Sequence, residues 1–195
     1  LLDSSLLYFD LVNIPGNNRS QQLRAAPFAL EEKLASDIEQ LHFVLGKRQD
    51  NGMIPVVCMD KNLLRTILQN FADTGIEIDM LLPDVLALPH TATHWSVLFD
   101  ANSVRIKNSS LTGFFFDREN FSSLLPALLE QHGAPQALNC YCLQSDAHGM
   151  ALADEAIAIN NHHYEHALSL HAANLRDARS MNLLQGEFAV KRKTG

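Results

Sequence analysis

One stretch near the end of the chain combines the residue types of a zinc site. The segment His162-His163-Tyr164-Glu165-His166 fits the pattern H-x-x-E-H, in which two histidines one helical turn apart bind zinc and the glutamate acts as a general base. Sites of this class take a further acidic ligand from a helix well downstream, and Glu187 is the only glutamate after His166. We therefore predict a solvent-exposed, histidine-rich start of a helix and no metal site.

Two other patterns contain catalytic or metal-binding residue types but lack the second half of a site. Asp73-Thr74-Gly75 matches the triplet of aspartic proteases, which need two such carboxylates facing each other, and no second copy occurs. The triplet instead follows a predicted helix, whose end favours a glycine in the left-handed conformation. A structural zinc site takes four ligands, and Cys58 supplies no second pair for Cys140 and Cys142, so we expect reduced thiols.

A strand and a long helix are predicted at the start of the chain. Residues 6–14 form an apolar run closed by Pro15-Gly16, which is typical of a strand followed by a turn. From Leu23 to Leu41, apolar residues recur every three or four positions, which predicts an amphipathic helix. Pro27 falls inside this helix, and we expect a kink there because proline removes a backbone hydrogen bond.

A βαβ unit is predicted next. Residues 53–59 and 76–80 have the composition of strands, and between them Asp60 is a typical helix N-cap ahead of an apolar helical face. Two strands joined by a helix in this way lie parallel, through a right-handed crossover. We expect residues 1–89 to form a first subdomain, in which residues 6–59 make a projecting lobe.

The second half of the chain follows a different order. Three short strands with tight connections predict an antiparallel meander, and a helix and a fourth strand follow them. The strands are expected at 95–99, 103–107, 113–116 and 137–143, with the helix between Asp117 and Gly133. The order β-β-β-α-β opens the ribonuclease H-like core, the unit that is doubled in actin-like proteins. The predicted fold class is therefore α/β, with actin-like (ribonuclease H-like) subdomains and mixed sheets, and the second subdomain covers residues 90–195.

The turn between the first two strands of this meander decides whether the core could bind a nucleotide. In actin-like ATPases the turn carries Asp-x-Gly and further glycines, because backbone N–H groups must approach the phosphates without intervening side chains. Here the turn is Asp100-Ala101-Asn102-Ser103 and has no glycine. The glycine-rich patterns of other nucleotide-binding loops are also absent from the sequence. We predict a degenerate phosphate loop, no catalytic residues and no cofactor.

Charge and composition exclude further classes of function. Hydrophobic residues make up 47% of the 195 residues and charged ones 19%, which is typical of a packed globular domain. Lys and Arg number 15 against 22 Asp and Glu, and the formal net charge of −7 disfavours nucleic acid and favours basic protein partners. No apolar run approaches the roughly 20 residues of a membrane-spanning helix.

Acidic residues gather along the first predicted helix. They are Glu31, Glu32, Asp37 and Glu39, and Phe28 is an apolar neighbour. A solvated helix face is the simpler interpretation of such a run. The alternative is a docking face, on which the carboxylates speed encounter with a basic partner and Phe28 holds the complex together.

Three segments together resemble the cytoplasmic region of the type II secretion system protein L family. They are Leu23–Phe43, Leu82–Pro89 and Met181–Phe188, and the last contains the pattern Asn-Leu-Leu-x-Gly-x-Phe/Tyr, the most specific of the three. The segments span most of the chain and occur in the family's order. Members of the family begin with further strands before the segment that matches residues 6–14, so the resemblance implies that the first subdomain is truncated here.

The resemblance implies an actin-like fold without catalysis and a role as an inner-membrane scaffold in type II protein secretion. In this family the cytoplasmic part binds the N-terminal domain of the secretion ATPase, protein E, and residues 28–39 are then the candidate docking face. It also implies a continuation into a transmembrane helix, with the C-terminal stretch next to the membrane, and contacts with protein M and other platform components. A homodimer stays open, as does the alternative of a nucleotide-binding actin-like ATPase.

Overall fold

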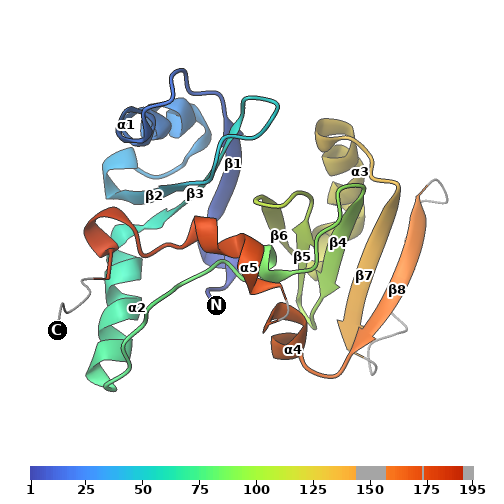
Figure 1. Ribbon diagram of the computed structural model, residues 1–195. Coiled ribbons are helices and arrows are strands. Elements are labelled where there is room, and N and C mark those ends of the chain that lie inside the picture. The colour runs from blue at the N-terminus through green and yellow to red at the C-terminus, as the bar shows by residue number, and fades with distance from the viewer. Residues whose placement is uncertain (144–156, 173, 191–195) are drawn as a thin grey trace. The chain divides into compact units, whose positions relative to one another are not determined.

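The chain passes twice between two compact units (Figure 1). It runs through unit 1, enters unit 2 between Pro83 and Asp84, and returns to unit 1 between Ala178 and Arg179. The computed structural model describes residues 1–143, 157–172 and 174–190. These units differ from the predicted subdomains, which met at residue 89 and placed the C-terminal stretch in the second. Residues 6–59, the predicted lobe, lie within unit 1.

Unit 1 is built on a three-stranded antiparallel sheet. Its strands are β1 (Tyr8–Val12), β2 (Leu41–Leu45) and β3 (Ile54–Asp60), and β3 lies in the middle. Register pairs Phe9 with Val57 on one side of β3 and Val44 with Val57 on the other. The β-branched, almost fully buried sequence of β3 suits this central position, because both of its faces and both of its edges are covered.

Helix α1 (Arg19–Leu30) covers one face of this sheet and is shorter than predicted. Asn18 caps its start by accepting from the N–H groups of Ser20 and Gln21. The helix ends at Leu30, and two 3-10 turns (Glu31–Lys33 and Ile38–Gln40) lead into β2. The apolar spacing as far as Leu41 matched a helical period by chance, because Asp37 starts a new turn and residues 41–45 enter the sheet.

Helix α2 (Lys61–Asp73) begins and ends as predicted, but the βαβ unit is wrong. Asp60 accepts from the N–H of Leu63 over 2.7 Å, and Gly75 has a φ of 76°, the left-handed conformation that ends a helix. Residues 76–80 are not a strand, and β3 pairs only with antiparallel neighbours. The physical reason is that β1 and β2 occupy both edges of β3, so a parallel strand has no place beside it.

The C-terminal segment packs on the sheet face away from α1. Its 3-10 turns are Arg179–Met181 and Gly186–Phe188. Between them, the N–H of Leu183 donates to the carbonyl of Leu81 over 2.9 Å, and the side chain of Asn182 accepts from the N–H of Leu81 over 2.9 Å. His42 of β2 donates to the carbonyl of Leu183 over 2.8 Å. These bonds hold the segment in unit 1.

Unit 2 has the ribonuclease H-like topology that the sequence predicted. Its elements are β4 (His94–Phe99), β5 (Ser103–Lys107), β6 (Gly113–Asp117), α3 (Phe121–His132), β7 (Ala137–Leu143) and β8 (Ala158–Tyr164). The sheet order is β6-β5-β4-β7-β8. The first three strands are antiparallel, whereas β7 and β8 run parallel to β4. The predicted α/β fold class is confirmed, and β8 is a strand that the prediction missed.

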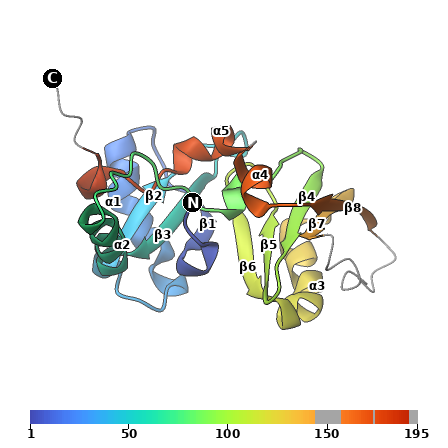
Figure 2. The same cartoon turned by 90° about the horizontal axis from the view of Figure 1, so that it is seen from below.

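Helices cover both faces of this sheet (Figure 2). Helix α3 lies on one face, where Phe121 and Leu125 join Val97 and Ile106 in the core. The short helix α4 (Ala167–Ala172) lies on the other face, followed by α5 (Leu175–Ala178). The predicted cap of α3 was misplaced, because β6 runs through Asp117 and a 3-10 turn (Arg118–Asn120) precedes the helix. Within the described ranges, no helix has the length and apolar character to cross a bilayer.

Candidate functional site

The hairpin between β4 and β5 stands where the sequence predicted a degenerate phosphate loop. The N–H of Asp100 donates to the carbonyl of Ser103 over 2.9 Å, so the turn is closed by its own backbone. Arg118 donates from its N–H to the carbonyl of Asn102 (2.9 Å) and from its guanidinium to the carbonyl of Asp100 (2.8 Å). Ala101 and Asn102 each carry a Cβ at this turn, where glycine would leave the backbone bare to an approaching phosphate.

The Asp100 carboxylate forms an ion pair with a buried arginine. Arg105 is 8% exposed and forms ion pairs with Asp100 and with Asp84, the latter at 2.6 Å from Nε to Oδ2. Its guanidinium also donates to the hydroxyl of Ser103 over 3.2 Å. Because the Asp100 carboxylate is paired with this guanidinium, it is a poorer ligand for the Mg²⁺ that accompanies nucleotide phosphates than a free carboxylate would be. Of the predicted phosphate-loop residues, Asp100 and Ser103 thus contact Arg105 and have a structural role.

The same sheet face holds a second buried cation. Lys107 is 1% exposed, and its ammonium donates to the carbonyls of Leu86 (2.8 Å) and Leu88 (2.9 Å). Lys107 and Arg105 are two residues apart on β5 and therefore share a face. His171 of α4 is also buried in unit 2, and burial lowers the pKa of its imidazole. These groups fasten residues 84–88 to the sheet, which explains where unit 2 begins.

The histidine-rich segment is a strand end and not the start of a helix. His162 and His163 lie in β8, where consecutive side chains point to opposite faces of the sheet. His162 stacks on Tyr141 with ring centroids 4.9 Å apart, and the Nδ1 of His163 lies 3.5 Å from the Sγ of Cys142. Across the part of the chain that the structure describes, no three His, Cys, Asp or Glu side chains are grouped so as to hold a metal ion.

The other patterns that resembled catalytic sites have local structural roles. Asp73 accepts from the side-chain amide of Gln69 over 2.7 Å, and the hydroxyl of Thr74 donates to the carbonyl of Phe71 over 2.8 Å, both at the end of α2. The cysteines are free and buried. Burial raises the pKa of the Cys58 and Cys140 thiols to about 12, so both are protonated and unreactive at neutral pH.

The five predicted docking residues are exposed and lie on one stretch of chain, residues 28–39, in which Leu30 is buried. Phe28 projects from α1 and is 69% exposed, which is unusual for an aromatic side chain. Glu31 and Glu32 follow in the first 3-10 turn, and Asp37 and Glu39 lie at the second. All four acidic residues are exposed. Within the part of the chain that the structure describes, Asp37 is the one of the four whose side chain makes a hydrogen bond: it accepts from the N–H of Glu39 and caps the second turn.

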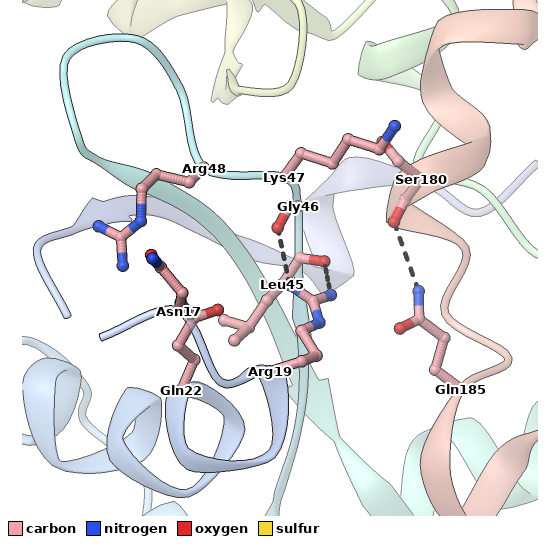
Figure 3. Close-up of a pocket in the computed structure, with 9 residues that line it drawn as sticks. All are labelled: Asn17, Arg19, Gln22, Leu45, Gly46, Lys47, Arg48, Ser180 and Gln185. Atoms are coloured by element: carbon pink, nitrogen blue, oxygen red, sulfur yellow. Dashed lines mark hydrogen bonds between the residues drawn. The ribbon is translucent and has the colours of Figure 1, made fainter. Parts of the chain in front are cut away.

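Sequence reasoning missed a pocket of about 430 Å³ in unit 1, most of whose lining residues are of polar types (Figure 3). It lies where the start of α1, the end of β2 and the C-terminal segment meet. Its cationic lining residues are Arg19, Lys47 and Arg48, and none of its lining residues is acidic. The adjacent basic pair Lys47-Arg48 after a strand was the available signal. Tertiary packing brings Arg19 to the same pocket as that pair, so the sequence did not reveal the site.

A scan against protein families matches residues 1–191 to the family described as type II secretion system (T2SS), protein L. A relative from Dickeya chrysanthemi, type II secretion system protein L, is 33% identical over 97% of this chain and 44% of its own length. The protein of the same name from Klebsiella pneumoniae is 31% identical over 99% of this chain and 45% of its own length. The chain thus spans less than half the length of these two relatives.

A solved structure shares the fold. It is the cytoplasmic domain of EpsL, an inner membrane component of the type II secretion system of Vibrio cholerae, with a TM-score of 0.82. Sequence identity is 24%, and the match covers 96% of this chain and 77% of that domain. The family match extends through all three segments on which the resemblance rested: the α1-to-β2 region, the passage into unit 2, and residues 181–188. The chain belongs to the type II secretion system protein L family.

Proposed function

We propose that the chain is the cytoplasmic part of a non-catalytic inner-membrane scaffold of a type II secretion system, and that it recruits the secretion ATPase, protein E. Its family membership makes it a type II secretion component. The observation that carries the recruiting role is the exposure of Phe28 (69%) beside four exposed carboxylates. An exposed aromatic side chain with charged neighbours is the usual composition of a docking surface with a small energetic centre.

The charges of this segment are available to a partner. Among the described residues, Glu31, Glu32, Asp37 and Glu39 make no ion pair with any Lys, Arg or His. The one cation within the segment, Lys33, is paired with Asp10 at 2.7 Å and so does not neutralise its neighbours. An uncompensated acidic surface accelerates encounter with a basic partner and fixes its orientation, even where each rim pair contributes little binding energy.

The hairpin of unit 2 supports a role without nucleotide chemistry. Its turn lacks the glycines that phosphate binding requires, and its carboxylate is paired with Arg105. The chain is then a passive binding partner, and any nucleotide turnover in the complex belongs to the ATPase. Contacts with protein M and a homodimer stay predictions, since they involve regions or copies outside this chain.

Charge reversal tests the docking surface. Replacing Glu31, Glu32 and Glu39 by Lys keeps Asp37 as the cap of its turn and changes the net charge from −7 to −1. We expect association with the protein E N-terminal domain to slow by about tenfold at low salt, with most of the salt dependence lost. Phe28→Ala should instead speed dissociation, because an apolar anchor acts after encounter. Stopped-flow or surface-based kinetics at several salt concentrations measure both rates.

A matched control separates a local surface from the overall charge. Glu119, Glu130 and Glu165 are exposed residues of unit 2, and replacing them by Lys gives the same net charge of −1. This variant should associate at close to the wild-type rate. If both variants associate equally slowly, the effect comes from the net charge of the chain, and the proposed docking surface is wrong. Unchanged kinetics in the Glu31/Glu32/Glu39 variant would move the docking face elsewhere, first of all to the meander of residues 95–116.

A further inference from the structure

The pocket of unit 1 concentrates positive charge in an acidic protein. Three of its lining side chains are cationic, whereas the chain as a whole has a formal net charge of −7. Within the described ranges, Arg19, Lys47 and Arg48 make no ion pair. Positive charges that line one pocket without a carboxylate among the described lining residues favour an anionic ligand.

Neutral carbonyl groups hold the two arginines in place. Arg19 reaches from α1 to the carbonyls of Gly46, at 2.7 Å, and of Leu45 at the end of β2 (Figure 3). Arg48 donates to the carbonyls of Ile14 (2.6 Å), Gly16 (2.7 Å) and Gly52 (2.5 Å). Carbonyl oxygens orient a guanidinium but carry no net charge, so the positive charges stay uncompensated. Partial burial even lowers the pKa of Arg19, and no carboxylate offsets that desolvation.

The remaining lining residues narrow the class of ligand. Gln22 is 6% exposed and donates to the carbonyl of Gly16 over 2.7 Å, so a rigid amide forms part of the wall. Asn17, Ser180 and Gln185 add further polar groups. Among the described residues that line the pocket, Leu45 is the one with an apolar side chain, and none is aromatic. Nothing here stacks on a nucleobase, and the pocket volume of about 430 Å³ suits a small molecule.

We infer that this pocket binds a compact soluble anion with more than one phosphoryl charge, held by Arg19, Lys47 and Arg48. Three cations match a multiply charged ligand better than a single carboxylate, and guanidinium groups suit the oxygens of phosphoryl groups. Because both arginines are pinned by the backbone, Lys47 is the cation that can turn toward the ligand. This inference is independent of the proposed ATPase-docking surface at residues 28–39.

Inorganic pyrophosphate is the probe for this site. Isothermal titration into the intact chain should give saturable binding with a dissociation constant below about 1 mM. Lys47→Glu should weaken it by about tenfold or more, because the variant places a repulsive carboxylate at the pocket. Lys47 is exposed and makes no recorded side-chain hydrogen bond, so its replacement leaves the arginine contacts intact. Amide chemical shifts of residues 17–22 and 45–48 should move during the titration.

The matched control is Arg24→Glu. Arg24 is an exposed residue of α1 outside the pocket lining, and the substitution changes the net charge by the same amount. Its affinity for pyrophosphate should stay within about twofold of wild type. Equal weakening in both variants, or no binding at about 10 mM pyrophosphate, would overturn the inference. Tighter binding of propane-1,2,3-tricarboxylate than of pyrophosphate would overturn the phosphoryl assignment. Thermal unfolding is the control that checks whether both variants are folded.

Discussion

Unit 2 and unit 1 each gather charged side chains near the end of a strand, but they satisfy them with different partners. In unit 2, Arg105 lies between the carboxylates of Asp84 and Asp100. In unit 1, the guanidinium groups of Arg19 and Arg48 meet only carbonyl oxygens among their recorded partners. The first arrangement pairs its buried cation with carboxylates and fastens a segment of chain to a sheet. The second arrangement fixes the orientation of the guanidinium groups but does not neutralise their positive charge, and this uncompensated charge favours binding of an anion.

The largest expected effect is on the free energy of unfolding, when a carboxylate that pairs with Arg105 is removed. The side chains of Asp84 and Arg105 are 12% and 10% exposed, so Asp84→Ala leaves a buried guanidinium without one of its two counter-charges. Breaking such a pair costs about 3 kcal/mol. Asp100→Ala should cost only about 1 kcal/mol, because that carboxylate is 36% exposed and water replaces it. Urea unfolding followed by the fluorescence of Trp95, the single tryptophan, reports on unit 2. Equal losses for the two variants would contradict the distinction.

Much of unit 2 was predictable from sequence because its signals are local. The strands at 94–99 and 103–107 alternate and are joined by a tight turn, and Gly133 has the left-handed φ of 81° that ends α3. Their antiparallel pairing follows from the short connections alone. The missed strand β8 has the opposite character. Its polar sequence, with both histidines, gives no apolar alternation, and it is defined by pairing with β7.

Unit 1 was harder because its pairing is not local. Residues 41–45 fit both the helical spacing from Leu23 and the buried strand that they form, and only the edge of β3 decides between the two. Residues 76–80 have β-branched composition, but β3 has no open edge to receive them. The C-terminal segment joins this unit through bonds between Leu183 and both Leu81 and His42. No local signal in the sequence shows such contacts.

The candidate sites divide in the same way. The missing glycines at 100–103 were visible directly, and the structure explains them by placing Asp100 beside Arg105. Neither the pairing of Arg105 with Asp84 nor the pocket of Arg19, Lys47 and Arg48 could be predicted, because each joins residues from separate segments. The acidic segment was visible as composition.

The pH dependence of stability tests one buried polar contact in unit 1, the hydrogen bond between His42 and the carbonyl of Leu183. His42 is buried and donates to the carbonyl of Leu183, and burial is the main cause that lowers its pKa. The unfolded chain therefore binds this proton at a higher pH than the folded one. The contribution of neutral His42 to stability is fully present above the unfolded value of about 6.5, and it is lost as the pH falls toward the folded value.

Hydrogen exchange measures this effect within unit 1. Amides of β2 and β3 should lose protection when the pH is lowered from about 7.5 to about 5.5, after correction for the intrinsic exchange rate. His42→Gln retains a donor for the carbonyl of Leu183 but does not titrate, so its protection should change less over the same range. His171 of unit 2 has a pKa lowered by the same main cause, so the difference between wild type and variant, and not the total change, measures the part that depends on His42. An identical pH response in both proteins would show that protonation of His42 does not cause the loss of protection.

The smallest expected effect is that of ATP on unit 2, where we expect none. The N–H of Asp100 is bonded to Ser103, its carboxylate is bonded to Arg105, and Ala101 and Asn102 carry side chains at the turn. A triphosphate would have to displace all of these groups and would gain no glycine-lined backbone in return. Titration with ATP and Mg²⁺ should therefore leave the amide shifts of residues 99–105 unchanged. A micromolar dissociation constant with shifts at this hairpin would establish a nucleotide site there and break the comparison. Weak binding that moves residues 45–48 and disappears in Lys47→Glu belongs instead to the pocket of unit 1, where the triphosphate acts as a phosphoryl anion.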